Sequence, residues 1–177
     1  MSKFQRLTST TSSATDVVAL VVRRLLIADE VAAAKLLAGR PIVDPGREWQ
    51  VLHTTQFLAV ELELGVDHAM CFFQAQVQAN REVQRGLFEK WVSKPSLAPT
   101  DGPEIEDIRT RIDLLDRTLL DALSRLRVRP KPLRAIDLRL AELNQINVFH
   151  LDRLHRRALS TALRAVVPDN ISWSSHA

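Results

Sequence analysis

The stretch that decides the fold is TDVVALVVRRLLIADEVAAAKLLA, residues 15–38. Its apolar residues recur at helical spacing and form one stripe, in which two cations are embedded. The positions of this stripe are Val17, Leu20, Val21, Arg24, Ala28, Val31 and Lys35. Asp16 is a candidate cap for its start, and Gly39 and Pro41 follow its last residue, the order typical of a helix end. We therefore predict one long amphipathic helix here.

Outward from this helix, residues that break helices divide the chain into further helical segments. We expect them at Asp44–Leu64, Asp67–Trp91, Glu104–Arg127 and Leu133–Val167, the last being one long or one kinked segment. Asp44 and Asp67 are the expected N-caps, with Pro45 at the first helical position. The predicted apolar faces of the later segments are Met70, Phe73, Val77, Val83 and Leu87, then Ile105, Ile108, Ile112, Leu115, Leu119 and Leu123, then Ile136, Leu140, Leu143, Ile146 and Phe149.

Composition agrees with a helical protein. Of 177 residues, 46% are hydrophobic and 25% are charged, which is ordinary for a globular chain, while glycine numbers only 5 and tyrosine is absent. No segment alternates with a period of two for long enough to be a strand. We predict an all-α, single-domain bundle of five to six helices over residues 14–168. A flexible Ser/Thr-rich leader at 1–13 and a loose tail at 169–177 are expected on either side.

Several functional classes lack their sequence signals. The longest apolar run near the N-terminus, Val17–Val22, is far shorter than the roughly 20 residues that span a bilayer, which excludes a membrane protein. Cys71 is the single cysteine, and we expect it to be buried beside two phenylalanines rather than to act as a nucleophile. The histidines have no zinc-binding spacing, and Gly-rich phosphate loops and GxSxG motifs are absent. Basic and acidic residues alternate, which argues against nucleic acid as a partner.

Two pairs of polar residues lie at helical spacing. Arg24 and Lys35 are 11 residues apart, so they share one face and lie about 16 Å apart along the helix axis, where long side chains could grip a small anion. Alternatively, each cation extends to water from the edge of the stripe. Asn80 and Gln84 are neighbours on one face, either as ligand contacts or as a solvated polar stripe.

Charged residues also gather at two predicted helix starts. Asp44, Arg47 and Glu48 form one group, whose alternative explanation is capping and compensation of the helix dipole. Arg109 lies among acidic residues in the first turns of another helix, where a surface ion pair would contribute little stability. Arginine outnumbers lysine 19 to 5, which suits bidentate binding of carboxylate or phosphate.

Taken together, these segments resemble the helical chorismate mutases of the exported gamma subclass. The resemblance rests on RLLIADEVAAAK at 24–35, PIVDPGRE at 41–48, the AN-x-x-x-Q pattern at 79–84, and Arg109 with Ile112 and Asp113 after a Pro-rich loop. It covers roughly residues 17–126, with a weaker match at 151–163. In this order and at this spacing the motifs are together fairly specific. The resemblance implies a complete active site within one chain.

The implied reaction is the pericyclic conversion of chorismate to prephenate in aromatic amino-acid biosynthesis, which needs no covalent intermediate, metal or cofactor. The enzyme must bind a dianion in a compact conformer and stabilise charge on its ether oxygen. By resemblance, Arg24, Arg47 and Arg109 bind the carboxylates and Lys35 and Gln84 donate to the ether oxygen. Glu48, assisted by Asp44, accepts from the ring hydroxyl, and Asn80 adds a polar contact near a carboxylate.

Some properties stay open at this stage. The chain departs from the family at Ala34, where an aromatic residue is common, and at Arg81, where a lysine is frequent; we expect neither to touch the substrate contacts directly. Family resemblance implies a periplasmic or secreted protein, whereas the absence of a signal peptide from this sequence favours the cytoplasm if it is full length. A homodimer also remains open. The alternative function is a non-catalytic helical relative that binds a small anion or a protein partner.

Overall fold

The computed structural model describes residues 3–127 and 133–166, and every regular element in these ranges is a helix. The elements in chain order are α1 (Lys3–Leu37), α2 (Pro45–Glu61), α3 (Val66–Ser93), the short 3₁₀ helix η1 (Pro95–Leu97), α4 (Ile105–Arg127), α5 (Ala135–Val148) and α6 (Arg153–Leu163). The predicted all-α bundle is therefore confirmed.

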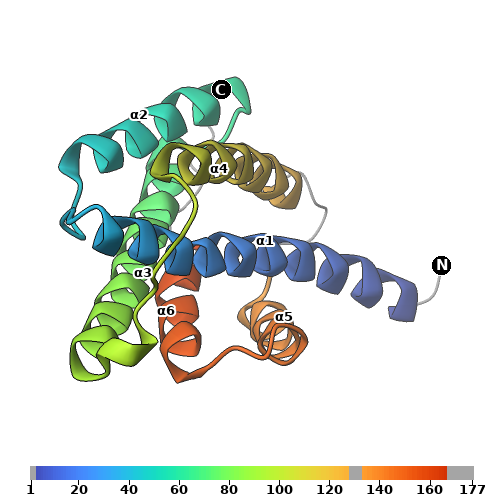
Figure 1. Ribbon diagram of the computed structural model, residues 1–177. Coiled ribbons are helices and arrows are strands. Elements are labelled where there is room, and N and C mark those ends of the chain that lie inside the picture. Colours follow the sequence, from blue (N-terminus) through green and yellow to red (C-terminus); the bar gives the residue numbers. More distant parts are fainter. Residues whose placement is uncertain (1–2, 128–132, 167–177) are drawn as a thin grey trace.

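Helix α1 is the central element of the bundle. It packs against α3, α4, α5 and α6, with α2 and α4 on one side of it and α5 and α6 on the other (Figure 1). Because neighbours lie on several sides, α1 buries more than one stripe: Val17, Val18, Val21 and Val22 are all inaccessible or nearly so. The core continues into α3, where the rings of Phe72 and Phe73 meet edge to face at 5.5 Å.

Local sequence explains where the site-bearing helix α2 begins. Asp44 is its N-cap, and the Asp44 side chain accepts a hydrogen bond from the backbone N–H of Arg47. Pro45 occupies the first helical position, where its missing N–H costs nothing. These features confirm the predicted start of the helix, and side chains of its first turn contact α4 and α3.

Several predicted boundaries differ from the structure. Helix α1 begins at Lys3 rather than Thr15, so the backbone of residues 3–13 continues the helix where a flexible leader was expected. Once a helix is nucleated, each further residue adds a hydrogen bond, which allows even a Ser/Thr-rich segment to join it. Gly65, not Asp67, caps α3. The predicted end at Pro168 and the tail at 169–177 lie outside the described residues.

The last predicted segment is two separate helices. Helix α5 ends with Phe149 as its C-cap, and His150 adopts a left-handed backbone conformation with φ of 49°. Asp152 then caps α6 by accepting from the backbone N–H of His155 at 2.9 Å. This aspartate is a helix-start signal that the apolar periodicity concealed.

Two predicted burial patterns are wrong. Helix α5 exposes Ile136, Leu140 and Leu143, whereas its most buried residues are Asp137, Ala141, Glu142 and Gln145. Each buried carboxylate has an arginine partner three residues earlier: Arg134 pairs with Asp137, and Arg139 pairs with Glu142. Burial therefore does not leave these carboxylates unpartnered. Cys71 is exposed, because it lies on the opposite side of α3 from the buried Phe72 and Phe73.

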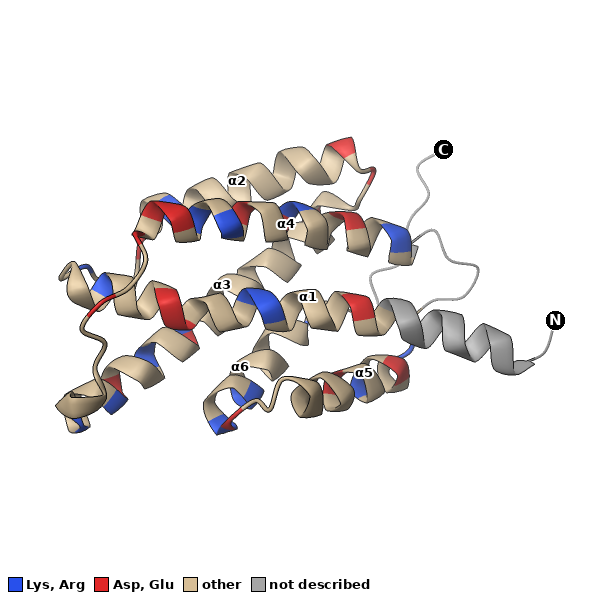
Figure 2. Cartoon of the chain, turned by 45° about the vertical axis from the view of Figure 1, so that its right-hand side comes forward, with Lys and Arg blue, Asp and Glu red and all other residues tan. Residues whose placement is uncertain are grey.

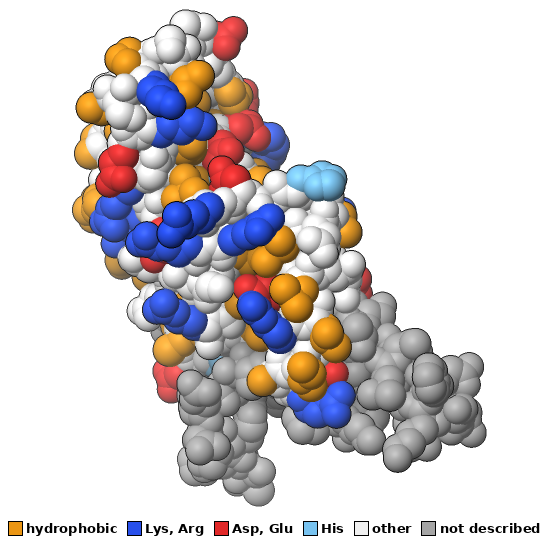
Figure 3. Space-filling view, turned by 90° about the horizontal axis from the view of Figure 1, so that it is seen from below, with side chains coloured by type: hydrophobic (Ala, Val, Ile, Leu, Met, Phe, Trp, Pro, Cys, Tyr) orange, Lys and Arg blue, Asp and Glu red, His pale blue; other side chains and the backbone are white. Residues whose placement is uncertain are grey.

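Charge is distributed along the helices rather than concentrated. Figure 2 shows acidic and basic residues interspersed on α1, α2 and α4. The face in Figure 3 likewise carries Lys and Arg side chains among acidic and apolar ones. None of the helices over residues 3–127 and 133–166 has the length and apolar character needed to cross a membrane.

Candidate active site

Arg24 and Lys35 lie on the central helix α1, and both are buried despite their charge. Arg24 donates to both carboxylate oxygens of Asp116 on α4, from Nε at 2.5 Å and from Nη2 at 3.3 Å. Its guanidinium carbon also lies 5.9 Å from the centre of the Phe73 ring. Lys35 donates from Nζ to the backbone carbonyl of Ile42 at 2.5 Å, just before α2. Neither cation extends freely to water. The alternative in which each charge reaches solvent from the edge of the apolar stripe therefore does not apply.

The first turn of α2 supplies acidic and basic groups to the same region. Oδ1 of Asp44 serves as the helix cap, and Oδ2 accepts from Nη2 of Arg109 at 2.7 Å. Arg47 donates from Nη2 to Asp113 at 2.5 Å. Glu48 accepts from Nε of Arg81 on α3 at 2.8 Å and also from its Nη2. One short segment therefore contacts α3 and α4 through three different side chains.

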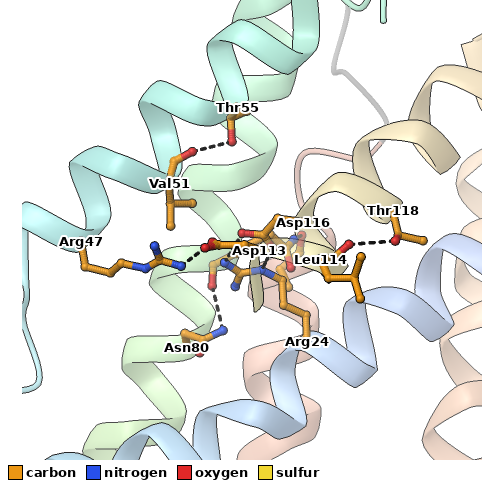
Figure 4. A network of polar contacts seen from close by, with 11 residues as sticks. Arg24, Arg47, Val51, Thr55, Asn80, Asp113, Leu114, Asp116 and Thr118 are labelled. Atoms are coloured by element: carbon orange, nitrogen blue, oxygen red, sulfur yellow. Dashed lines mark hydrogen bonds and ion pairs between the residues drawn. The ribbon is translucent and has the colours of Figure 1, made fainter. Parts of the chain in front are cut away.

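Helix α4 presents Arg109, Asp113 and Asp116 on one face, since spacings of four and three residues align side chains on a helix. Arg109 bridges Asp44 and Glu106, the latter at 2.8 Å from Nη1. Figure 4 shows Arg24 of α1, Arg47 of α2 and the two aspartates of α4 pointing toward one another, with Asn80 of α3 beside them. These residues come from segments far apart in the chain.

Helix α3 contributes two amides and one arginine. Asn80 donates weakly to the carbonyl of Gln76 on its own helix at 3.4 Å, so its amide is not committed to another element. Gln84, one turn later, is only 5% exposed, and its Oε1 has no hydrogen-bond partner among the described residues. A buried amide oxygen without a partner is unfavourable in the protein alone. The Oε1 of Gln84 therefore has unused capacity to accept a hydrogen bond.

The electrostatics of Lys35 show which charged groups share its surroundings. Burial lowers the pKa of the Lys35 ammonium below its ordinary value. Asp44 and Glu48 act in the opposite direction and raise this pKa, while Arg109 and Arg81 lower it further. The ammonium therefore lies within the electrostatic range of groups from α2, α3 and α4. We call these residues together with Arg24, Arg47, Asp113 and Asp116 the polar cluster.

The structure thus brings together most of the predicted site residues. Arg24 and Arg47 meet through the aspartates of α4, and Lys35, Asp44, Glu48 and Arg109 share one electrostatic environment. Asn80 and Gln84 lie on α3, without a hydrogen bond to these groups in the described part of the chain. The residues 3–127 and 133–166 contain no group of three or more His, Cys, Asp or Glu arranged to hold a metal ion.

Three members of the polar cluster had no predicted role at the site. Arg81 was expected to stay away from the substrate contacts, but it binds Glu48 through two nitrogens. Asp113 and Asp116 each engage one of the predicted carboxylate-binding arginines. Two local signals were available: both aspartates follow Arg109 at helical spacing, and Asp116 lies four residues after Ile112 and three before Leu119, beside the predicted apolar face.

Comparison with known proteins identifies the family. A family model described as chorismate mutase type II matches residues 14–85. The chain is also 31% identical over 156 residues to a secreted chorismate mutase of Mycobacterium tuberculosis, which covers 88% of this chain and 78% of that protein. This chain belongs to the chorismate mutase family. The resemblance to the exported chorismate mutases is therefore confirmed.

Further chorismate mutases agree in sequence and in fold. A secreted chorismate mutase of Mycolicibacterium smegmatis is 33% identical over 120 residues, which is 66% of each chain. The crystal structure of a chorismate mutase from Burkholderia phymatum superposes with a TM-score of 0.82 at 28% identity, over 91% of this chain and 99% of that one. Most of this chain therefore shares its fold with a chorismate mutase.

Proposed function

We propose that this chain converts chorismate to prephenate, and that the polar cluster with Asn80 and Gln84 is its active site. The observation that carries the proposal is the meeting of buried or half-buried cations from three separate helices, α1, α2 and α4. Burying a charge is costly unless something compensates it, and a dianionic substrate is a ligand that these cations suit. Family membership supports the same substrate.

Arg24, Arg47 and Arg109 bind the two carboxylates of chorismate in this proposal. A guanidinium forms paired hydrogen bonds with a carboxylate, so each arginine fixes orientation as well as charge. Their anchor points on different helices allow them to approach the substrate from different sides. Binding in this way selects the compact conformer in which the bond-forming carbons are close, which lowers the entropic part of the barrier.

The present partner of Arg47 is easily replaced by a substrate carboxylate. The side chain of Asp113 is 59% exposed and makes one contact with Arg47, so it returns to water at little cost. Asp44 is 35% exposed at its side chain and remains useful as the helix cap even when it releases Arg109. Substrate binding therefore exchanges carboxylates on these two arginines instead of desolvating bare cations.

Lys35 and Gln84 stabilise the ether oxygen, on which negative charge develops as the carbon–oxygen bond breaks. The ammonium of Lys35 is held by Ile42, and this fixed position avoids reorganisation during the reaction. Gln84 donates to this oxygen through its Nε2–H, whereas its unpartnered Oε1 is an acceptor and takes no part in this contact. A rate enhancement of about 10⁶ requires about 8 kcal/mol, and fixed donors of this kind typically contribute about 3–4 kcal/mol each.

Glu48 and Asp44 accept the hydrogen bond from the ring hydroxyl in this proposal, and Asn80 contacts a carboxylate. The two-nitrogen contact with Arg81 holds the Glu48 carboxylate in one orientation. Arg81 is therefore an indirect participant that sets the position of Glu48.

The test is turnover of chorismate by the purified protein, followed by loss of chorismate absorbance and formation of prephenate. We expect Arg109→Ala to reduce kcat/KM about 100-fold, within the range for loss of a preorganised donor. Arg125→Ala is the matched control, because Arg125 lies on the same helix in an exposed i, i+4 ion pair. A folded wild-type protein that binds chorismate without converting it would instead support the non-catalytic alternative.

An exported location is proposed on the basis of the relatives. Both proteins from mycobacteria described above are named secreted chorismate mutases. Fractionation of the native cells, with detection of the protein and of chorismate mutase activity in each fraction, tests this proposal. Recovery of both in the cytoplasmic fraction alone would contradict it.

A further inference from the structure

Asp116 is the most deeply buried carboxylate of the polar cluster, and no substrate contact has been attributed to it. It is 8% exposed, and both of its oxygens face Arg24, which is 4% exposed. The two residues are 92 positions apart and join α1 to α4. Oδ1 accepts from Nε at 2.5 Å and Oδ2 from Nη2 at 3.3 Å, which is the paired geometry of an arginine–carboxylate contact.

Stability alone is a weak explanation for this buried pair. Removing two charges from water costs several kcal/mol per ion, and apolar residues of similar volume often serve the fold as well or better. Other apolar residues of α4, such as Leu119 and Leu120, fill the adjacent core positions completely. The pair is therefore better explained by a need to hold the Arg24 guanidinium in one position.

The geometry leaves part of Arg24 available. A guanidinium carries five N–H donors, of which Asp116 engages one on Nε and one on Nη2. The ring of Phe73 lies 5.9 Å from the guanidinium carbon and restricts the group further. The remaining donors, on Nη1 and on the free side of Nη2, point away from Asp116.

We infer that Asp116 is a positioning residue that holds the Arg24 guanidinium so that its remaining donors face a carboxylate of the substrate. This inference rests on the proposed function of the polar cluster. Asp116 itself does not touch the substrate; it fixes the orientation of Arg24 before binding, which reduces the entropy lost on binding.

Asp113, one turn earlier on α4, provides the contrast. Its side chain is 59% exposed and contacts Arg47 through one nitrogen, so it is exchangeable, whereas Asp116 is enclosed and engages two nitrogens. The same residue type on the same helix face therefore has two different tasks. Substrate replaces Asp113 on Arg47, but it joins Asp116 on Arg24.

The charge of Asp116 depends on its surroundings on all sides. Burial raises the pKa of this carboxyl above its ordinary value, and Arg24 from α1 is the main group that opposes the shift. Asp113 on the same helix raises the pKa, and Arg47 from α2 lowers it. A protonated Asp116 loses its charge-assisted hold on Arg24, so substrate binding is expected to weaken as the pH falls.

The experiment compares steady-state kinetics with chorismate for the wild type, Asp116→Asn and the control Asp121→Asn. Asp121 lies on the same helix in an exposed pair with Arg125. Loss of a partner that orients a binding group typically costs about 10- to 100-fold, so we expect KM of Asp116→Asn to rise by this factor while kcat changes less. Asp121→Asn should match the wild type, and unchanged kinetics in Asp116→Asn would overturn the inference.

A double-variant cycle separates positioning from a structural role. If Asp116 acts only through Arg24, Asp116→Asn should add little to the KM increase already caused by Arg24→Lys. Effects that multiply would refute the inference. If Asp116→Asn does not fold, as judged by circular dichroism, the pH profile decides: KM of the wild type should rise on acidification and that of Arg24→Lys should change less. Equal profiles would overturn the inference, whereas a wild type without turnover would contradict the proposed function itself.

Discussion

The polar cluster and the apolar core between α1, α3 and α6 use the same helices for opposite purposes. In the core, Val22, Phe72, Ala158 and Leu159 exclude water completely and stabilise the fold through contact and burial. In the polar cluster, charged groups are withdrawn from water and held by one another, which contributes little net stability. Burial of the apolar core therefore supplies the free energy of folding that offsets the cost of removing the charges of the polar cluster from water.

The strongest way to sharpen this comparison is Lys35→Met, which removes a buried charge and keeps the length of the side chain. We expect kcat/KM to fall about 10³-fold, the upper range for one preorganised donor. The unfolding midpoint in urea should stay the same or rise, because burial already disfavours the charged form of Lys35.

The matched control is Lys90→Met, since Lys90 lies exposed on α3. It should leave both activity and stability at wild-type values. A loss of stability in Lys35→Met as large as that of a core truncation would show that the polar cluster supports the fold, contrary to the comparison.

Leu159→Ala tests the other region. Leu159 of α6 is fully buried, and truncations of this kind lower the free energy of unfolding by about 2–5 kcal/mol. Activity per folded molecule should remain within a few-fold of the wild type, because Leu159 lies on α6, which contributes no residue to the polar cluster. Chemical denaturation measures the loss of stability, and kinetics at low temperature measure activity. Leu114→Ala is the control, because Leu114 is 69% exposed. A selective loss of kcat in a stable Leu159→Ala protein would argue against separate roles.

Gln84→Glu changes the charge of one buried amide and tests whether Gln84 donates to the ether oxygen. Only a protonated carboxyl can donate, and burial raises the pKa of a carboxyl. The rate should therefore decline with rising pH, about tenfold per pH unit above that pKa. Gln78→Glu, on the exposed side of α3, provides the control profile. A profile for Gln84→Glu that follows the wild type would rule out this contact.

The smallest expected effect concerns His155, a charged group held at the edge of the core. Its ring contacts Asp29 of α1 at 2.9 Å and Asp152 at 2.7 Å, and the hydrogen bond with Asp29 is the main cause that raises the pKa of His155 to about 9. Because this pKa lies above the ordinary value of 6.5, the stabilisation is complete below about pH 6.5 and is lost as the pH rises through about 9.

Both carboxylates are exposed, so solvent screens their interaction with His155. The charged His155 therefore contributes on the order of 1 kcal/mol to the free energy of unfolding, or roughly 2–4 °C in Tm. Thermal unfolding of the wild type and of His155→Gln between about pH 6 and 9.5 measures it, with the exposed His53→Gln as control. The difference in Tm between wild type and His155→Gln should shrink as the pH rises. A constant difference would show that His155 is not charged in the folded state.

Local signals in the sequence predicted the elements of the fold and much of the site. The apolar stripe of α1, the cap at Asp44 and the shared face of Arg24 and Lys35 each depend on residues within a few turns of one another. The break at His150 and the exposed apolar face of α5 were missed, because periodicity marks an amphipathic helix but not which of its faces meets the core. Substrate roles for the site residues remain proposals.

By itself, the sequence determined the helical class, most helix boundaries and the set of polar groups that resembles a chorismate mutase site, because spacing and capping act over short distances along the chain. Only the tertiary structure decided the partners: Glu48 with Arg81, Arg47 with Asp113 and Arg24 with Asp116 lie 33, 66 and 92 residues apart. Such pairs depend on how α1–α4 pack, and packing is governed by the fit of whole helix surfaces rather than by any local pattern.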